Sequence, residues 1–229
     1  EEEEQRKSGF KEGIRYVRSD RTILCMIGLI ALTTIFVFPF LSVMLPLYVR
    51  NVLHLGADRM GYLMAMSAVG SLTGSLGLLS VARHLRFRFM TGAACVAAVA
   101  LFCMSRSADF ALTAASMIVL AVGLSLNFGL AGTIVQERAP AHLRGRVSAV
   151  FGLSFFGLMP VAGLLTTSLS DAIGMQTALM LSSFCFGLGA IFVMNLAGRT
   201  VEAAPVDPIP AGDPEMASPS PAPAHAPTA

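Results

Sequence analysis

Charged side chains are scarce in this 229-residue sequence: Asp, Glu, Lys and Arg together make up 13%, against about 25% in an ordinary soluble domain. Hydrophobic residues make up 55%, and they come in long uninterrupted blocks rather than at amphipathic spacing. This combination excludes an ordinary soluble domain and indicates that lipid is the solvent. The net charge of +2 is too small for a nucleic-acid-binding surface, so we expect no nucleic acid among the partners.

The long apolar blocks also lack acidic residues and histidines. All fourteen Asp and Glu residues lie outside them, and so do His54, His84, His142 and His225. Proton relays, intramembrane metal sites and aspartyl or zinc proteases need a buried carboxylate or histidine. The blocks also contain no Lys or His that would activate a serine nucleophile. We therefore expect no enzyme, no metal site and no cofactor.

Cysteines are few and are not arranged as a motif. Cys25, Cys95, Cys103 and Cys185 lie inside apolar blocks, without CxxC spacing and without His or acidic neighbours. We expect them to be small packing residues.

Six apolar blocks are long enough to cross a hydrocarbon core about 30 Å thick. They cover residues 22–49, 60–82, 89–105, 110–135, 147–169 and 175–197. Backbone amides in lipid must be paired within the chain, and the period-two pattern of a membrane barrel is absent, so we expect helices. The sequence therefore predicts an all-α membrane protein with a six-helix transmembrane domain over residues 22–197.

The two ends of the sequence differ from the apolar domain. Residues 1–21 form a predicted linker in which Phe10, Ile14 and Val17 recur at helical spacing, as in an amphipathic helix on the membrane surface. In residues 198–229, eight of the twelve prolines are interleaved with Ala, Ser and acidic residues, which predicts a disordered tail.

Basic residues near the ends of the blocks predict the orientation. Thirteen of the sixteen Lys and Arg residues fall on one side of the membrane, and three (Arg50, Arg59 and Arg106) fall on the other. By the positive-inside rule, both termini should be cytoplasmic in a multi-pass protein of the cell membrane.

Prolines and small residues interrupt the apolar blocks in a pattern that predicts kinks and close packing. Pro39 and Pro46 fall in the first block and Pro160 in the fifth, where each removes a backbone hydrogen bond. Kinks of this kind occur both beside transport cavities and in helices that only pack. The residues that we expect to serve helix packing or gating are Gly70, Gly74, Gly77, Pro160 and Gly163.

Asn127 is the only amide side chain deep in the fourth block. An amide without a partner in hydrocarbon costs several kcal/mol. We therefore expect this side chain either to line a wet cavity or to bond another helix.

Three segments resemble the major facilitator superfamily, particularly its drug and siderophore exporters. They are residues 9–18 (GFKEGIRYVR), 47–53 (LYVRNVL) and 136–147 (QERAPAHLRGRV), together with the glycine-rich second block. The resemblance implies that the six spans form the C-terminal half of a twelve-helix transporter. It also implies that the second and fifth spans contact the missing N-terminal six-helix half, while the third and sixth face lipid. Residues near the substrate would then be Pro39, Phe40, Met44, Ser125, Asn127 and Thr133.

The loop between the second and third blocks departs from the pattern of this family. It carries Arg83, Arg86 and Arg88, but no acidic residue lies between Arg59 and Asp109. We therefore expect no gating salt bridge centred on this loop; its arginines remain free to pair with acidic groups elsewhere or with lipid headgroups. Two further loop charges, Arg144 and Arg146, precede the fifth block.

Taken together, these features predict half of a secondary transporter that exports an amphipathic small molecule by alternating access. Thirteen Met and fifteen Phe residues supply adaptable apolar surface, which suits varied ligands and lipid contact equally. The sequence begins at Glu1 rather than Met, so we expect it to be part of a longer chain. The alternative is a six-span membrane scaffold or partner subunit that transports nothing alone.

Overall fold

The computed structural model describes residues 12–202, with side chains as far as residue 198. This part of the chain is all helical, as predicted. A short helix over residues 12–19 comes first. It is followed by α2 (Arg21–Phe36), η1 (Phe40–Met44), α3 (Leu45–Asn51), α4 (Ala57–Leu79), η2 (Arg83–Leu85), α5 (Arg86–Arg106), α6 (Phe110–Arg138), α7 (Arg144–Phe156), α8 (Met159–Ile173) and α9 (Met175–Glu202).

Six helical stretches within these residues are long and apolar enough to cross a membrane, as the sequence predicted. They are Arg21–Asn51, Ala57–Leu79, Arg83–Arg106, Phe110–Arg138, Arg144–Ile173 and Met175–Gly198. Because α9 continues to Glu202, the first residues of the predicted tail are helical. The rest of that tail, residues 203–229, lies outside the described residues, as does the linker before residue 12.

The predicted interruptions of the first and fifth spans are confirmed. The α2 helix ends at Phe36, and a π-helical segment begins directly after Pro39. Pro46 lies in the first turn of α3, and Pro160 lies in the first turn of α8, just beyond the end of α7. Proline is tolerated in a first turn because the N–H that it lacks has no partner there. Each span is therefore built from segments that meet at a proline.

Two acidic residues just outside the spans cap helices. Asp20 accepts hydrogen bonds from the backbone N–H groups of Thr22 and Ile23, at 2.8 and 3.2 Å, and so begins α2. Asp109 accepts one from the N–H of Leu112, at 2.9 Å, and begins α6. A carboxylate at this position satisfies N–H groups that the helix itself leaves unpaired.

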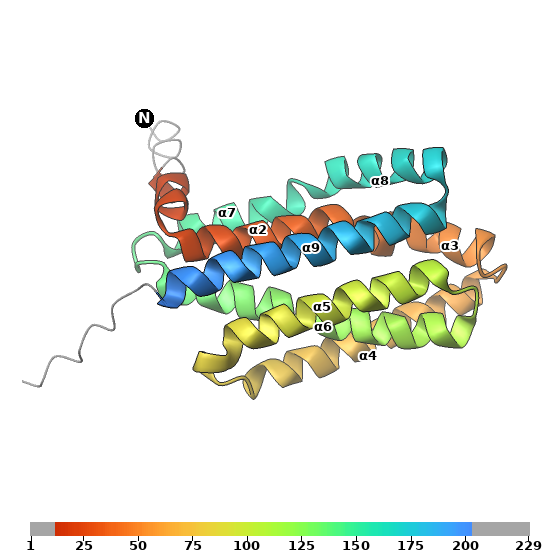
Figure 1. Cartoon of the computed structure of the whole chain (residues 1–229), viewed down its shortest axis with the longest axis horizontal. Coiled ribbons are helices and arrows are strands. Elements are labelled where there is room, and N and C mark those ends of the chain that lie inside the picture. Colours follow the sequence, from red (N-terminus) through yellow and green to blue (C-terminus); the bar gives the residue numbers. More distant parts are fainter. Residues whose placement is uncertain (1–11, 203–229) are drawn as a thin grey trace, which may run out of the picture.

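The helices form a bundle with two exposed edges (Figure 1). In the apolar stretches of the first and fourth spans, 56% and 50% of the residues are buried. The corresponding shares for the second span (α4) and the fifth (α7 and α8) are only 17% and 11%. These two spans lie along opposite sides of the bundle in Figure 1 and leave most of their apolar surface uncovered within the described residues.

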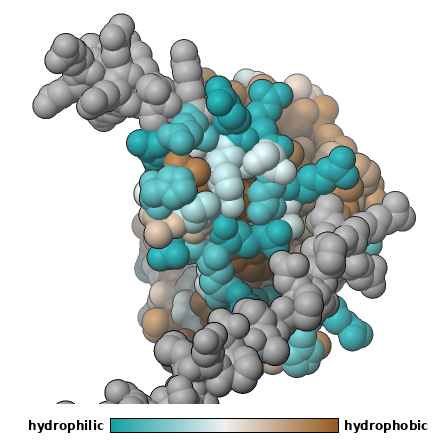
Figure 2. Space-filling model, turned by 90° about the vertical axis from the view of Figure 1, so that its left-hand side faces the viewer, coloured by the Kyte–Doolittle hydropathy of each residue, from teal (hydrophilic) through white to brown (hydrophobic). Residues whose placement is uncertain are grey.

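Basic and polar side chains gather at one end of the bundle. This end carries the helix over residues 12–19, the loop before α5 and the loop between α6 and α7, and we call it the basic end. Figure 2 looks onto it and shows hydrophilic residues across its surface, with hydrophobic residues along the flank. The helix over residues 12–19 runs across the bundle rather than along it (Figure 1).

The glycines of α4 pack directly against the backbone of α6. A methyl group added at Gly74 would lie 2.7 Å from the carbonyl oxygen of Val122 and 2.9 Å from Cβ of Ser125, and one added at Gly70 would collide with Ile118. Gly77 and Gly163 have only ordinary contacts, at 3.8 and 3.7 Å. The close helix packing expected of Gly70 and Gly74 is therefore present, and its partner is α6 of the same chain.

Replacing Gly74 with Ala is expected to destabilise the protein by about 1–3 kcal/mol, since overpacking against a backbone carbonyl forces the two helices apart. Gly61→Ala is the matched control in the same helix, because a methyl group there meets nothing within 4 Å. It should be neutral or stabilising by up to about 1 kcal/mol. Thermal unfolding of the purified protein in detergent measures both, and equal effects of the two variants would contradict the assigned packing.

Candidate functional site

Three half-buried phenylalanines from different spans meet: Phe38 between α2 and η1, Phe128 of α6 and Phe155 of α7. The ring centroids of Phe38 and Phe155 are 4.5 Å apart, those of Phe128 and Phe155 are 5.0 Å apart, and those of Phe38 and Phe128 are 5.9 Å apart. All three pairs are edge-to-face, the geometry that the charge distribution of aromatic rings favours. We call Phe38, Phe128 and Phe155 the aromatic cluster. The exposed ring of Phe156 extends it, at 4.9 Å from Phe155.

An open hollow of about 500 Å³ begins at Phe128 and runs along α6 towards the basic end. Small residues, Gly129 and Gly132, form its floor, and Thr133 lines it. The Thr133 hydroxyl donates to the carbonyl of Gly129 at 2.8 Å. The far end of the hollow is polar and is lined by Gln136, Glu137 and Arg144. The hollow is therefore aromatic at one end and charged at the other, which suits a molecule with one apolar and one polar part.

The other predicted cavity residues in the first span lie elsewhere. Pro39 is buried, and Phe40 and Met44 are each 2% exposed. The ring of Phe40 packs edge-to-face on Tyr48, at 5.4 Å between centroids. Phe40 and Met44 border a gap of only about 10 Å³ against residues of α8 and α9. In this conformation they belong to the core of the bundle and not to the open hollow.

Ser125 and Asn127 also lie apart from the hollow. Ser125 hydrogen-bonds the hydroxyl of Ser75 at 2.9 Å and donates to the carbonyl of Ser71 at 3.0 Å, so it ties α6 to α4. Asn127 is fully buried, and neither its Oδ1 nor its Nδ2 has a hydrogen-bond partner among the described residues. In this conformation, Asn127 neither reaches an open cavity nor makes the interhelical bond that the sequence left as its alternative.

Two arginines at the start of the third span, Arg83 of η2 and Arg86 as the first residue of α5, pair with an acid from another helix. Glu137, near the end of α6, accepts hydrogen bonds from Nη1 of Arg86 at 2.8 Å and from Nη2 of Arg83 at 3.1 Å. This is one of the two possibilities left open for these arginines, pairing with an acidic group elsewhere in the chain. An ion-pair site therefore exists at this loop although the loop itself carries no acid. Arg88, by contrast, makes no ion pair with any described residue.

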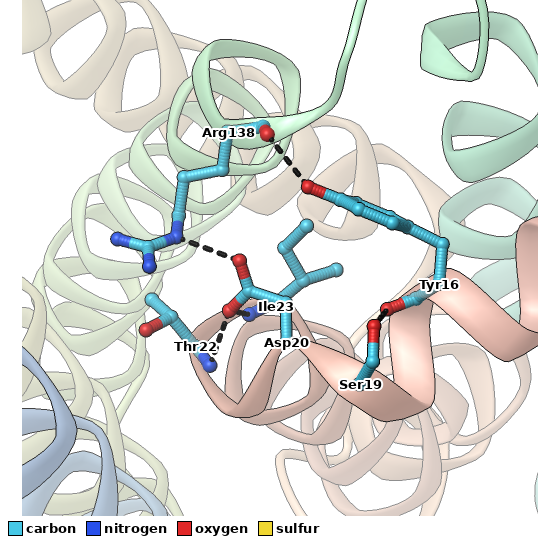
Figure 3. A network of polar contacts seen from close by, with 6 residues as sticks. All are labelled: Tyr16, Ser19, Asp20, Thr22, Ile23 and Arg138. Atoms are coloured by element: carbon cyan, nitrogen blue, oxygen red, sulfur yellow. Dashed lines mark hydrogen bonds and ion pairs between the residues drawn. The ribbon is translucent and has the colours of Figure 1, made fainter.

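Arg138, the residue after Glu137, connects α6 to the beginning of the first span (Figure 3). Nε of Arg138 donates to Oδ2 of Asp20 at 3.0 Å, while Oδ1 of the same Asp20 caps α2. The hydroxyl of Tyr16 donates to the carbonyl of Arg138 at 3.0 Å. The C-terminal end of α6 is thus bonded to α5 through Glu137 and to the first span through Arg138.

Arg144 and Arg146, expected in the loop before the fifth span, lie instead in the first turn of α7 and are arranged differently from one another. Arg146 pairs with Glu12 of the helix over residues 12–19, and Gly13 packs against the same arginine. Arg144 instead lines the polar end of the hollow. The predicted amphipathic helix is therefore tied to α7 by an ion pair as well as to α6 by the hydrogen bond of Tyr16.

Asp20→Asn is expected to weaken only the contact between helices, whereas Asp20→Ala also removes the helix cap. Asn caps a helix about as well as Asp but carries no charge for Arg138. We expect Asp20→Asn to lower stability by less than about 1 kcal/mol, as for an exposed ion pair, and Asp20→Ala by about 1 kcal/mol more. Thermal unfolding of the two variants compares them directly, and equal losses would contradict the capping role.

Six helices long and apolar enough to cross a membrane are typical of a multi-pass integral membrane protein, and comparison with known families identifies its class. The sequence model of the Major Facilitator Superfamily matches residues 1–164, and the chain belongs to this family of transporters, which are not enzymes. It is 32% identical to the multidrug efflux pump Tap of Mycobacterium tuberculosis (strain ATCC 25618 / H37Rv) over 206 residues, which are 86% of this chain and 47% of the pump.

A second relative is more distant. The multidrug efflux pump Tap of Mycolicibacterium fortuitum is 27% identical over 199 residues, which are 82% of this chain and 47% of the pump. The chain thus spans about half the length of the curated relatives it matches.

Neither the aromatic cluster nor the role of Glu137 was predicted from the sequence. The phenylalanines of the cluster come from three spans and carry no spacing signal, and Glu137 lies more than fifty residues from the arginines that it binds. The segment 136–147, which carries part of the family resemblance, contains Glu137 and Arg138 and was the one available pointer to this cluster of charges.

Proposed function

We propose that this chain is the C-terminal six-helix half of a twelve-helix secondary transporter that exports an amphipathic small molecule by alternating access. The observation that carries the proposal is the hollow along α6, with aromatic rings at one end and Glu137 and Arg144 at the other. Membership of the family and similarity to efflux pumps over about half their length support it. Both termini are cytoplasmic in this proposal, since the basic end belongs on the cytoplasmic side.

The missing half occupies the two exposed edges of the bundle in this proposal. The second and fifth spans keep most of their apolar surface uncovered within the described residues, and large apolar side chains such as Tyr62, Leu72, Phe156 and Leu164 are 59–72% exposed. A partner half would cover such surfaces, and rocking against it would expose the hollow to each side in turn. Any proton coupling then resides in the other half, because no carboxylate or histidine is buried in the described spans.

The reading frame upstream of Glu1 separates this proposal from the scaffold alternative. Six further spans in frame support a twelve-helix transporter. A start codon directly before Glu1 would favour a six-span scaffold or a dimer of halves instead.

Removing a ring of the aromatic cluster is expected to weaken export. Phe128→Ala and Phe155→Ala each delete an edge-to-face contact and apolar area beside the hollow, a loss of about 1 kcal/mol that corresponds to about a fivefold rise in the KM for export. The KM is measured from the efflux of amphipathic dyes, such as ethidium and Nile red, by cells that express the full-length protein.

The matched control is Phe102→Ala, which removes a ring from a comparable edge-to-face pair with Phe184 on α5 and α9, away from the hollow. Its KM should remain unchanged. Equal effects of the control and the cluster variants, or no effect of either cluster variant, would remove the aromatic cluster from the substrate path.

A further inference from the structure

A second depression, apolar except at one end, lies between α5 and α6 and is separate from the hollow. It is an open groove of about 630 Å³, lined mainly by Phe89, Gly92 and Val96 of α5 and by Val122 and Leu126 of α6, with Arg88 at one end. The groove and the hollow of the proposed substrate path share no lining residue.

Small residues create this groove. A methyl group added at Gly123 would lie 2.7 Å from the carbonyl oxygen of Ala93, so α5 and α6 are in close contact at its base. A methyl group added at Gly92 would meet nothing within 4 Å, so the space above Gly92 is open. The walls are apolar and exposed, with Phe89 and Val96 each 47% exposed. An exposed apolar groove of this length on a membrane span fits a hydrocarbon chain.

The charge at the end of the groove identifies the kind of headgroup. Of the three arginines near the start of α5, Arg83 and Arg86 are bound by Glu137, and Arg88 has no acidic partner among the described residues. The first turn of α5 also contains no acidic residue. None of the residues that line the groove is acidic. This end of the groove therefore favours an anion.

We propose that the groove binds an anionic phospholipid, with one acyl chain along Phe89, Gly92 and Leu126 and the phosphate at Arg88. The basic end lies in the cytoplasmic leaflet under the proposed orientation, and anionic lipids are enriched there. The proposal rests on that orientation but not on any transported substrate. A lipid held here contacts both α5, from the first three spans, and α6, from the last three.

The test uses the full-length protein in vesicles that contain either phosphatidylglycerol or phosphatidylcholine with a photoreactive group in the acyl chain. After illumination, labelled peptides are mapped by mass spectrometry. We expect phosphatidylglycerol to label residues 85–96 and 122–126 more than phosphatidylcholine does. Arg88→Gln should reduce that labelling about fivefold, the ratio that corresponds to the ~1 kcal/mol a basic residue contributes near an anionic surface. Arg88→Lys should retain it.

Gly92→Leu tests the groove itself, because its Cβ enters open space and its larger side chain takes up room in the groove, which should reduce labelling of the same peptides at least fivefold. Arg106→Gln, at the other end of α5, is the matched control and should label like the unchanged protein. Excess inorganic phosphate should not displace the lipid.

Four results would overturn the proposal. Equal labelling by the two lipids would remove the anion preference, and unchanged labelling in Gly92→Leu would leave an anion site without an acyl chain. Displacement of the lipid by inorganic phosphate would likewise indicate a site for an anion without an acyl chain. No labelling of these peptides in the unchanged protein would mean that protein, from the missing half or a second copy, covers the groove. None of these results depends on export, so the lipid proposal and the transport proposal can fail independently.

Discussion

Glu137→Gln is expected to lower export by about tenfold while leaving the protein folded. The substitution removes the charge that binds both Arg83 and Arg86, at 3.1 and 2.8 Å. Exposed ion pairs contribute up to about 1 kcal/mol each to stability, so unfolding should change little. If both contacts exist in only one of the two conformations of a transporter, however, losing about 1.4 kcal/mol changes the ratio of those conformations tenfold.

The conformational change has its own measurement besides export. In a variant without the native cysteines, Thr133→Cys places a reactive thiol in the hollow, and a membrane-impermeant maleimide reports its access from the basic end. We expect Glu137→Gln to lower the labelling rate severalfold, because it disfavours the conformation described here, in which the hollow is open towards the basic end.

Asp58→Asn is the matched control for the loss of a carboxylate. Asp58 lies 3.9 Å from Arg59 at the opposite end of the bundle, and both side chains are more than half exposed. Export and labelling should remain unchanged in this control. The reversed pair, Glu137→Arg with Arg86→Glu, keeps the ion pair with its charges exchanged. If it restores both export and the labelling rate, the ion pair rather than the identity of residue 137 is what export requires. Normal export and normal labelling in Glu137→Gln would show that the ion pairs are merely structural.

Asn127→Leu is expected to raise stability and to lower export. Asn and Leu have the same number of side-chain heavy atoms in the same branched arrangement, so the change removes two polar atoms without leaving a cavity. Neither polar atom has a partner among the described residues, and a buried polar group without a partner costs about 1–3 kcal/mol. The free energy of unfolding, measured by thermal unfolding, should therefore rise by that amount.

The expected loss of export follows from the same observation. We propose that the amide of Asn127 finds its partner in another conformation, through substrate or through a neighbouring helix, and that Leu cannot supply that contact. Losing a hydrogen bond of about 1–1.5 kcal/mol in that conformation would reduce export five- to tenfold. Stability and activity then change in opposite directions, which a purely structural role does not produce.

Ser125→Ala is the comparison for this prediction. It deletes the hydrogen bonds to Ser75 and Ser71, so it should lower stability, by about 1 kcal/mol. Unchanged export in Asn127→Leu would remove Asn127 from the transport path, and unchanged stability would show that its amide already has a partner.

The membrane class and the interruptions of the spans were predictable because each depends on local properties of the chain. Apolar length decides whether a segment crosses a bilayer, and the missing N–H of Pro39 or Pro160 interrupts a helix in any surroundings. The close packing of Gly70 and Gly74 was likewise readable as a small-residue face, although the sequence did not identify α6 as the partner.

The candidate site was harder to predict because its parts are far apart in the sequence. Phe38, Phe128 and Phe155 are three of fifteen phenylalanines, and only the packing of their spans separates them from those that face lipid. Thr133 was predicted from the family resemblance and does line the open hollow. Phe40, in contrast, is only two residues from Phe38 and lies in the core, because π-helical geometry and helix rotation decide which side a residue takes.

The sequence by itself determined that this is an all-helical protein of six spans with most of its basic residues at one end, since hydropathy and proline act within a single turn or span. Only the tertiary structure decided how those basic residues are used. Glu137 lies 51 and 54 residues from Arg86 and Arg83, and the packing of α6 beside α5 brings them together and leaves Arg88 at the end of the groove between these two helices. The distribution of partners among three neighbouring arginines is a property of helix packing, because an ion pair forms only where two side chains come within about 4 Å.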